Sequence, residues 1–256
     1  MGPLDAILLF GAALLAGALN SVAGGGSFIS FPTLIFTGVP PIAANATNTV
    51  ALWPGAVASV GAYRREFRGA GLLLWVMALV SLLGGAAGAL LLLKTPETTF
   101  VRVLPWLLLA ATLIFALGPW LNERLRRARG NRPHPAGLVL AAAALGQVVI
   151  SVYGGFFGGG IGMLMLAALS LVGMTNIHAM NALKTLLSAL INGVAVVAFA
   201  VAGVVAWPQA LLMIAGAVVG GYGGAWYAQK IDPRLVRRFV VLTGAAMTAY
   251  FFWNAA

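Results

Sequence analysis

Apolar stretches of about 20 residues recur along the whole chain, separated by breaks at glycine, proline and charged residues. A helix needs about 20 apolar residues to cross a hydrocarbon core of about 30 Å. Lipid offers no partner to backbone N–H and C=O groups, so each crossing must be a helix or belong to a closed barrel. These Leu, Ala and Val runs lack the alternation of barrel strands. With 61% hydrophobic and 8% charged residues, the sequence predicts an all-α polytopic membrane protein.

The breaks divide the chain into ten expected segments, eight of them long enough to span a bilayer. The two short segments cover about half a span at about 1.5 Å per residue, and each follows a glycine cluster. We therefore expect them to be halves of broken helices or hairpins. The segments are 5–22, 27–37, 44–62, 70–93, 101–121, 136–153, 161–172, 177–204, 207–229 and 235–253.

The net charge of +10 comes from basic residues that gather in three links between apolar segments. We interpret this pattern as a topology signal rather than a nucleic-acid surface, and the positive-inside rule places the three links in the cytoplasm. The number of crossings between the second and third links is even if 136–153 and 161–172 act as a pair, either as two crossings or as a re-entrant hairpin. The same count places both termini outside, and the first segment lacks the features of a cleaved signal peptide. The link residues are Arg64, Arg65, Arg68, Arg124, Arg126, Arg127, Arg129, Arg132, Lys230, Arg234, Arg237 and Arg238.

The second half of the chain repeats the order of the first: a long helix, a glycine cluster, a short helix, an Asn-containing stretch and further long helices. The first copy begins outside and the second inside, so we expect inverted repeats, an architecture of alternating-access carriers. Each repeat is a glycine-interrupted helix pair or hairpin followed by three transmembrane helices. The expected division is a first repeat at 1–122, a basic cytoplasmic linker at 123–135 and a second repeat at 136–256, which together form one transport domain.

The two glycine clusters are candidate substrate sites, because each opens a half-helix whose N-terminal N–H groups carry partial positive charge. Glycine also lets a backbone approach a ligand closely. Close helix packing is the alternative for either cluster alone. Other glycines lie four residues apart within full spans, a spacing that indicates helix packing only. They are Gly84, Gly85 and Gly88, and Gly216, Gly220 and Gly224. The candidate site residues are Gly24, Gly25, Gly26 and Ser27 in the first cluster, and Gly158, Gly159 and Gly160 in the second.

Lys184 is an ammonium group a few residues into the long apolar segment 177–204, where burial costs about 2.5 to 3.5 kcal/mol at mid-depth. One explanation is attraction of an anionic substrate; the other is snorkelling toward the cytoplasmic surface. Neutral polar residues lie on the same side of this segment and at the corresponding place in the first repeat. A polar cap at the helix start is the alternative for those of the first repeat, above all for Asn45. The neutral polar residues are Asn181, Thr185, Ser188 and Asn192, and Asn45, Thr47, Asn48 and Thr49.

The five carboxylates all fall at segment ends or in links, whereas cation carriers and carboxylate proton relays usually need one at mid-depth. We therefore expect a negative cargo and a small anion as partner. If transport is coupled to protons, His178 or Tyr153 would be the group that carries the proton. The chain has no cysteine, which excludes disulfides, Cys-ligated metals and thiol nucleophiles; we expect no cofactor and no metal. The carboxylates are Asp5, Glu66, Glu97, Glu123 and Asp232.

Four stretches resemble the sulfite exporter TauE/SafE family: residues 19–28, which include Asn20; 32–38 with 45–48; 154–162; and 177–185. Together with length and repeat order, the resemblance covers nearly the whole chain. It implies export of sulfite, sulfoacetate or related sulfur oxyanions and organosulfonates across the cytoplasmic membrane of a prokaryote. The direction of transport is implied by the resemblance alone.

Three other functions compete with a carrier. In a membrane enzyme, Ser188 and Lys184, one helical turn apart, would act as nucleophile and base, but no oxyanion motif accompanies them. A structural membrane subunit is the second alternative. A passive anion channel is the third, although duplicated inverted halves favour alternating access. We predict a secondary transporter of a small anion, sulfite or an organosulfonate, and not an enzyme.

Overall fold

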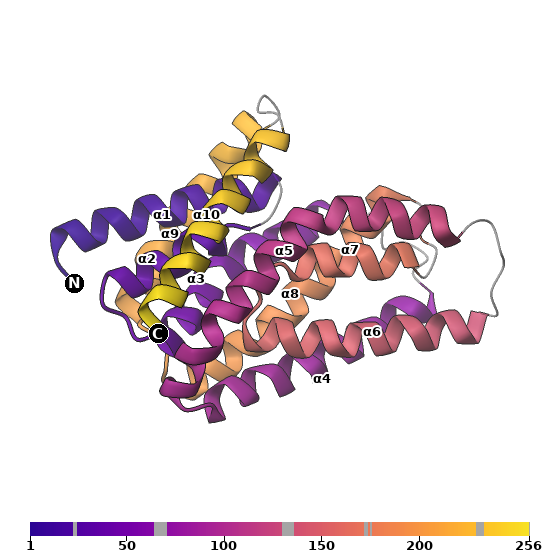
Figure 1. The fold of residues 1–256 in the computed structure, drawn as a ribbon, viewed down its shortest axis with the longest axis horizontal. Helices are drawn as coiled ribbons and strands as arrows, with labels where there is room; N and C mark the ends of the chain where they lie inside the picture. Colours follow the sequence, from indigo (N-terminus) through magenta and orange to yellow (C-terminus); the bar gives the residue numbers. More distant parts are fainter. Residues whose placement is uncertain are drawn as a thin grey trace.

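The structure, a computed structural model, describes residues 1–22, 25–63, 71–129, 136–171, 174, 176–228 and 233–255. These residues form ten α-helices and no strand, as the apolar segments predict (Figure 1). The helices are α1 (Pro3–Val22), α2 (Ser27–Phe36), α3 (Pro41–Ala62), α4 (Leu72–Lys94), α5 (Glu97–Arg129), α6 (Ala136–Phe156), α7 (Ile161–Leu171), α8 (Ile177–Val201), α9 (Trp207–Ala228) and α10 (Pro233–Ala255).

Eight of the described helices have 20 or more residues, enough to cross about 30 Å of hydrocarbon. In the described part of the chain, four of them are also apolar enough along a sufficient length: Pro3–Asn20, Leu72–Lys94, Glu97–Gly118 and His178–Val201. Helix α3 carries the polar residues of the candidate site and α10 begins with arginines. The two exceptions in length are α2, with 10 residues, and α7, with 11.

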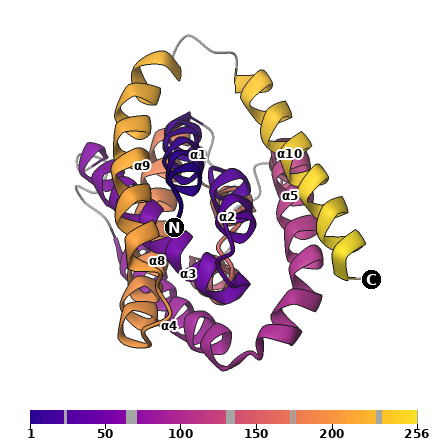
Figure 2. The same ribbon diagram turned by 90° about the vertical axis from the view of Figure 1, so that its left-hand side faces the viewer.

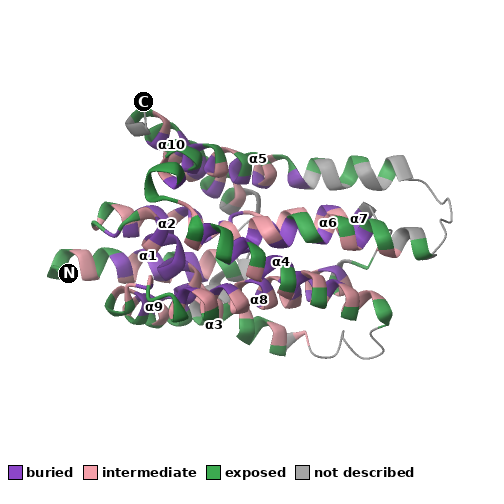
Figure 3. Cartoon of the chain, turned by 90° about the horizontal axis from the view of Figure 1, so that it is seen from below, coloured by how far each residue is buried: buried purple, intermediate pink, exposed green. Residues whose placement is uncertain are grey.

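Exposed residues, green in Figure 3, occur along the long helices, and many of them are large and apolar. Ile7 on α1, Trp75 on α4 and Leu242 on α10 each expose about 70% of their surface. A soluble protein rarely exposes such extended apolar surface, and here it suits contact with lipid tails. The chain is therefore a multi-pass membrane protein in which the bilayer covers these faces.

Glycine allows two pairs of long helices to touch backbone to backbone. Helix α9 packs along α1, and α4 packs along α6. A Cβ added at Gly220 would overlap the carbonyl oxygen of Leu14, and one added at Gly88 would overlap that of Val152. The predicted packing role is thus confirmed at Gly84, Gly85, Gly88, Gly216 and Gly220, while the surroundings of Gly224 lie outside the described residues.

Each short helix turns back on the long helix before it. Helix α2 packs against α1, and α7 packs against α6. Figure 2, looking along the long axis, shows α2 between the α1 and α9 pair on one side and α5 and α10 on the other. The two half-helices therefore lie inside the helix bundle, not on its surface.

Helix α3 ties the first half of the chain to the second. Its Asn45 Nδ2 donates to the Phe156 carbonyl at 3.0 Å, and its Trp53 Nε1 donates to the Ala189 carbonyl at 3.0 Å. Its Thr47 Oγ1 accepts a bond from the Ala206 N–H at 3.0 Å. These bonds hold α3 against the end of α6, the middle of α8 and the start of α9.

The largest boundary difference concerns α5. The segment expected over 101–121 begins at Glu97 and continues as helix to Arg129, so the first residues of the expected linker 123–135 are helical. Arg124 and Arg127 are exposed there, with Arg124 over the ring of Trp120 and Arg127 paired with Glu123. Arginine is a good helix former. The charged residues therefore end the apolar segment, but the helix continues through them to Arg129.

Candidate functional site

The first glycine turn joins α1 to α2 and is closed by a side chain from α1. Gly25 has a φ of 88°, a left-handed conformation that favours glycine. The Gly26 N–H donates to Asn20 Oδ1 at 2.8 Å, and Ser30 Oγ lies 3.2 Å from the Gly26 carbonyl oxygen. The predicted site residue Gly24 lies outside the described residues.

The second glycine turn joins α6 to α7 in a similar way. Gly158 and Gly160 have φ values of 80° and 77°. The Tyr153 hydroxyl donates to the Gly159 carbonyl at 2.7 Å. In both turns, a polar side chain near the end of the preceding helix bonds a backbone group six residues later.

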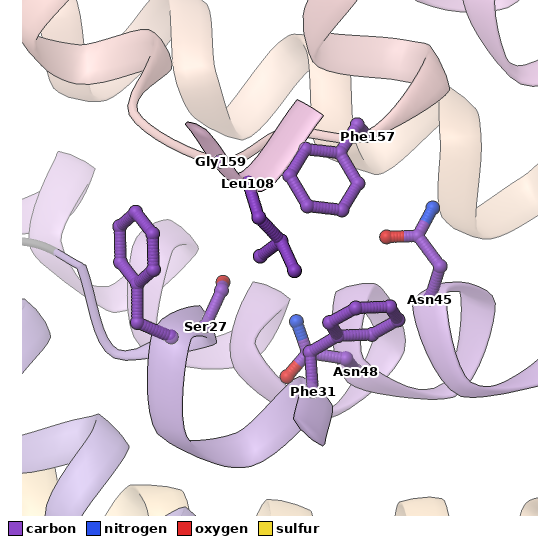
Figure 4. A pocket seen from close by; sticks show the side chains of 8 residues that line it. Ser27, Phe31, Asn45, Asn48, Leu108, Phe157 and Gly159 are labelled. Carbon is purple, nitrogen blue, oxygen red and sulfur yellow. The ribbon is translucent and has the colours of Figure 1, made fainter. Parts of the chain in front are cut away.

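A pocket lies where these two turns approach each other (Figure 4), with an empty volume of about 250 Å³ that includes space open to the outside. None of its lining residues is charged. They are Ser27, Phe28, Phe31, Asn45, Asn48, Leu108, Phe157 and Gly159.

Two asparagines of α3, one turn apart, are two of the three polar side chains in the lining. Ser30 Oγ donates to Asn48 Oδ1 at 2.5 Å, and Figure 4 shows the Asn48 amide nitrogen on the pocket side. Asn45 donates its Nδ2 to the Phe156 carbonyl, which leaves its Oδ1 facing the pocket. Asn45 is the fifth residue of α3, and its side chain bonds another helix. It is therefore not the helix cap considered from the sequence.

The structure separates Thr47 from this pair. Its hydroxyl accepts from the Ala206 N–H, and Thr47 is not among the pocket residues. The neighbouring Thr49 donates to the Asn45 carbonyl at 2.8 Å within α3. Residues close in sequence on a helix point in different directions, which explains why the predicted cluster of polar residues divides.

Lys184 lies beside the start of α7 and not in the pocket lining. A Cβ added at Gly162 would meet the Lys184 Cδ at 3.3 Å, so the lysine stem runs against the first turn of α7. Among the described residues, Lys184 has no ion pair or hydrogen bond, and the N–H groups of Ile161 and Gly162 have no acceptor. The stem of Lys184 thus lies against a half-helix N-terminus that has two unpaired N–H groups.

The other candidates on α8 are half-buried around Lys184. Ser188 Oγ donates to Met165 Sδ at 3.6 Å rather than to Lys184, so the pair is not arranged as a nucleophile and base. Asn192 lies near the second glycine turn, 3.9 Å from where a Cβ of Gly158 would lie. No hydrogen bond of the Asn181 or Thr185 side chain occurs within the part of the chain that is described.

The described carboxylates lie in the first turn of a helix or, for Glu123, at an exposed position of α5 beyond its apolar stretch. Asp5 is in the first turn of α1, Glu97 begins α5 and accepts from the Ile42 N–H at 3.0 Å, and Glu123 pairs with Arg127. Glu66 and Asp232 lie outside the described residues. Among the residues that are described, no group of three His, Asp or Glu could hold a metal ion.

Of the two groups considered for proton coupling, His178 is exposed in the first turn of α8, where Asn176 Oδ1 caps the His178 and Ala179 N–H groups. Tyr153 is engaged in the second glycine turn. Neither lines the pocket.

Sequence reasoning missed the apolar part of the lining. Phe28, Phe31 and Phe157 adjoin the glycine clusters, so their positions offered a signal, whereas Leu108 is one leucine among many in α5. It also missed a buried polar contact away from the pocket, in which Gln147 Nε2 of α6 donates to Ser81 Oγ of α4 at 2.8 Å. A glutamine inside an apolar segment was the available signal for that contact.

A protein family and individual relatives match nearly the whole chain. The family described as "Sulfite exporter TauE/SafE" matches residues 9–251. A "probable membrane transporter protein" of Haemophilus influenzae is 31% identical over 249 residues, 96% of this chain and 94% of the relative. The "probable membrane transporter protein YfcA" of Escherichia coli K12 is 30% identical over 265 residues, 100% of this chain and 92% of the relative. No solved structure matches.

Proposed function

Because the chain belongs to the sulfite exporter TauE/SafE family of membrane transporters, we propose that it is a secondary carrier of a small anion, with sulfite or an organosulfonate as the substrate. It would export this anion across the cytoplasmic membrane of a prokaryote by alternating access. The family is one of transporters, so the chain is not an enzyme.

The observation that carries the proposal is the pocket between the two glycine turns, in which three polar side chains lie among aromatic and aliphatic ones. It presents neutral hydrogen-bonding groups from Ser27, Asn45 and Asn48, and no carboxylate lies among its lining residues. Anions bound by proteins are commonly held by N–H and O–H donors at such interrupted helices. A carboxylate in the lining would repel an anion, and the described carboxylates, Asp5, Glu97 and Glu123, are not among the lining residues.

Lys184 supports a negative substrate independently. An unpaired ammonium inside an apolar bundle is costly, and the cost falls when an anion is bound nearby. The unpaired N–H groups of Ile161 and Gly162 lie at the positive end of α7. We propose that Lys184 and this helix end form the second part of the anion path, next to the pocket.

The proposed inverted repeat has support in the helix packing. Exchanging α1 to α5 with α6 to α10 converts the α1 and α9 contact into the α6 and α4 contact. It likewise converts α2 against α10 into α7 against α5, and α3 against α9 into α8 against α4. The pocket then lies where the two halves meet, as alternating access requires.

The experiment is transport in liposomes that contain the purified protein. Uptake of labelled sulfite and of a small sulfonate is measured for the wild type, for Lys184→Ala and for the control Lys94→Ala, whose lysine is exposed in the last turn of α4. We expect saturable uptake that Lys184→Ala lowers about 10- to 100-fold, because a hydrogen bond to a charged group contributes about 1.5 to 3 kcal/mol. The control is expected to change little.

Counter-flow separates a carrier from a channel. Unlabelled anion on the far side should stimulate uptake by a carrier, whereas a passive channel would show flux without this stimulation. No anion flux under any imposed gradient would contradict the anion assignment altogether.

A further inference from the structure

The polar groups of the pocket are not all donors. A backbone carbonyl can only accept, so the bond from Asn45 to the Phe156 carbonyl must use the amide nitrogen of Asn45. The amide is therefore fixed with its oxygen toward the pocket, as Figure 4 shows. An oxygen that only accepts hydrogen bonds would repel an oxyanion that has no donor of its own. This position in the pocket therefore suits a hydrogen-bond donor on the ligand.

The other polar groups of the pocket suit the anion itself. Asn48 presents an amide nitrogen, since its oxygen accepts from Ser30 Oγ at 2.5 Å. Ser27 presents a hydroxyl, which can donate or accept. A ligand that bridges Asn48 and Asn45 must thus offer an acceptor at one end and a donor at the other.

Charge limits the ligand further. No lining residue is charged, and the side chain of the cation Lys184 lies against Gly162 in the first turn of α7. Burying a charge without compensation is costly. One cation can balance a monoanion but leaves a dianion with an uncompensated charge.

From these observations we infer that Asn45 selects a monovalent oxyanion that carries its own O–H or N–H donor, and that dianions and anions without a donor bind less well. For sulfite the matching species is hydrogensulfite, and for sulfonates those with a hydroxyl or amino group near the sulfonate. This inference rests on the proposed function and names the substrate form that its site takes.

The test compares two anions of the same charge and the same number of heavy atoms. Hydroxymethanesulfonate carries a hydroxyl where ethanesulfonate carries a methyl group. Each is used, together with the dianion sulfate, to inhibit uptake of labelled sulfite into liposomes at a fixed pH near 6. In the wild type, hydroxymethanesulfonate is expected to inhibit at about a tenfold lower concentration than ethanesulfonate, because a polar site group left unpaired disfavours the analogue. Sulfate is expected to inhibit least.

Two variants of α3 show which residue causes the preference between the two sulfonates. Asn45→Leu removes the acceptor and should bring the ratio between the two sulfonates close to one. Asn48→Leu removes donors and should weaken inhibition by both sulfonates while keeping their ratio. If Asn45→Leu fails to fold, the wild-type ratio still tests whether the site prefers an anion that carries its own donor, and an Asn48→Leu variant that keeps this ratio excludes Asn48 as its cause.

The outcomes separate the two proposals. Sulfite uptake with equal inhibition by both sulfonates, or with sulfate as the strongest inhibitor, would overturn the role of Asn45 and leave the anion carrier standing. A ratio that survives Asn45→Leu in a folded protein would overturn it as well. Absence of sulfite uptake in the wild type would overturn the proposed function.

Discussion

At the scale of single residues, Gly25 shows how the turn between α1 and α2 constrains its sequence. Its φ of 88° disfavours any side chain. In addition, a Cβ there would lie 2.8 Å from Val240 Cγ1 on α10 and 3.3 Å from the Phe115 ring on α5. The turn is therefore held by neighbours on two distant helices as well as by its own conformation.

Gly25→Ala is expected to destabilise the protein by more than the matched change Gly38→Ala. Gly38 has a similar φ of 84°, but no atom lies within 4 Å of an added Cβ. Gly38→Ala therefore measures the conformational cost, about 1 to 2 kcal/mol, and Gly25→Ala adds the clash with Val240 and Phe115. Thermal unfolding of the two purified variants in detergent checks this, and equal losses would show that α5 and α10 do not restrain the turn.

At the scale of elements, α5 contacts both glycine turns. Phe115 lies against Gly25, and the Ala111 Cβ would be 3.2 Å from a Cβ at Gly159. Leu108, one turn further along, lines the pocket between them. A shift of α5 relative to either turn would therefore change the shape of the pocket.

The contact between α1 and α9 allows a sharp test of helix packing. A Cβ at Gly220 would overlap the Leu14 carbonyl oxygen, whereas at the neighbouring Gly221 the nearest atom is the Gly17 carbonyl oxygen at 3.8 Å. We expect Gly220→Ala to lower stability by about 1 to 3 kcal/mol, as overpacking does, and Gly221→Ala to have little effect. Unfolding in detergent measures both. Similar stability of the two variants would mean that the helices do not approach as closely as described.

At the scale of the whole molecule, the chain has a defined polarity. Both termini lie at the left-hand end of Figure 1, while the end of α5 and the start of α6 lie at the right-hand end. This arrangement agrees with the expectation that both termini are outside, because the basic end of α5 would then be cytoplasmic.

Single cysteines can test this orientation, since the natural chain has none. Leu4→Cys and Thr98→Cys, both at exposed positions, are expected to react in intact cells with a maleimide that cannot cross membranes. Arg127→Cys, exposed near the end of α5, should react only after the membrane is permeabilised. The reverse pattern would invert the topology and with it the proposed direction of access.

The sequence alone was sufficient for several features of the fold. Hydropathy predicted the membrane class and all ten helices, and the glycine clusters marked the turns before α2 and α7. These features are local: a segment's affinity for lipid and a glycine's tolerance of positive φ depend on the residue and its neighbours in sequence. For the same reason, the ends of α5 were placed less well, because its helix outlasts its apolar stretch.

Only the tertiary structure decided which polar groups meet. Asn45 bonds Phe156, 111 residues away, while Thr47, two residues along, turns to Ala206. Leu108 completes the pocket, and Lys184 lies beside it against Gly162. In a soluble helix an apolar face would have indicated the buried side, but in a bilayer the lipid-facing and protein-facing sides are both apolar. The rotation of each helix, and therefore the composition of the site, is set by packing between segments far apart in the chain.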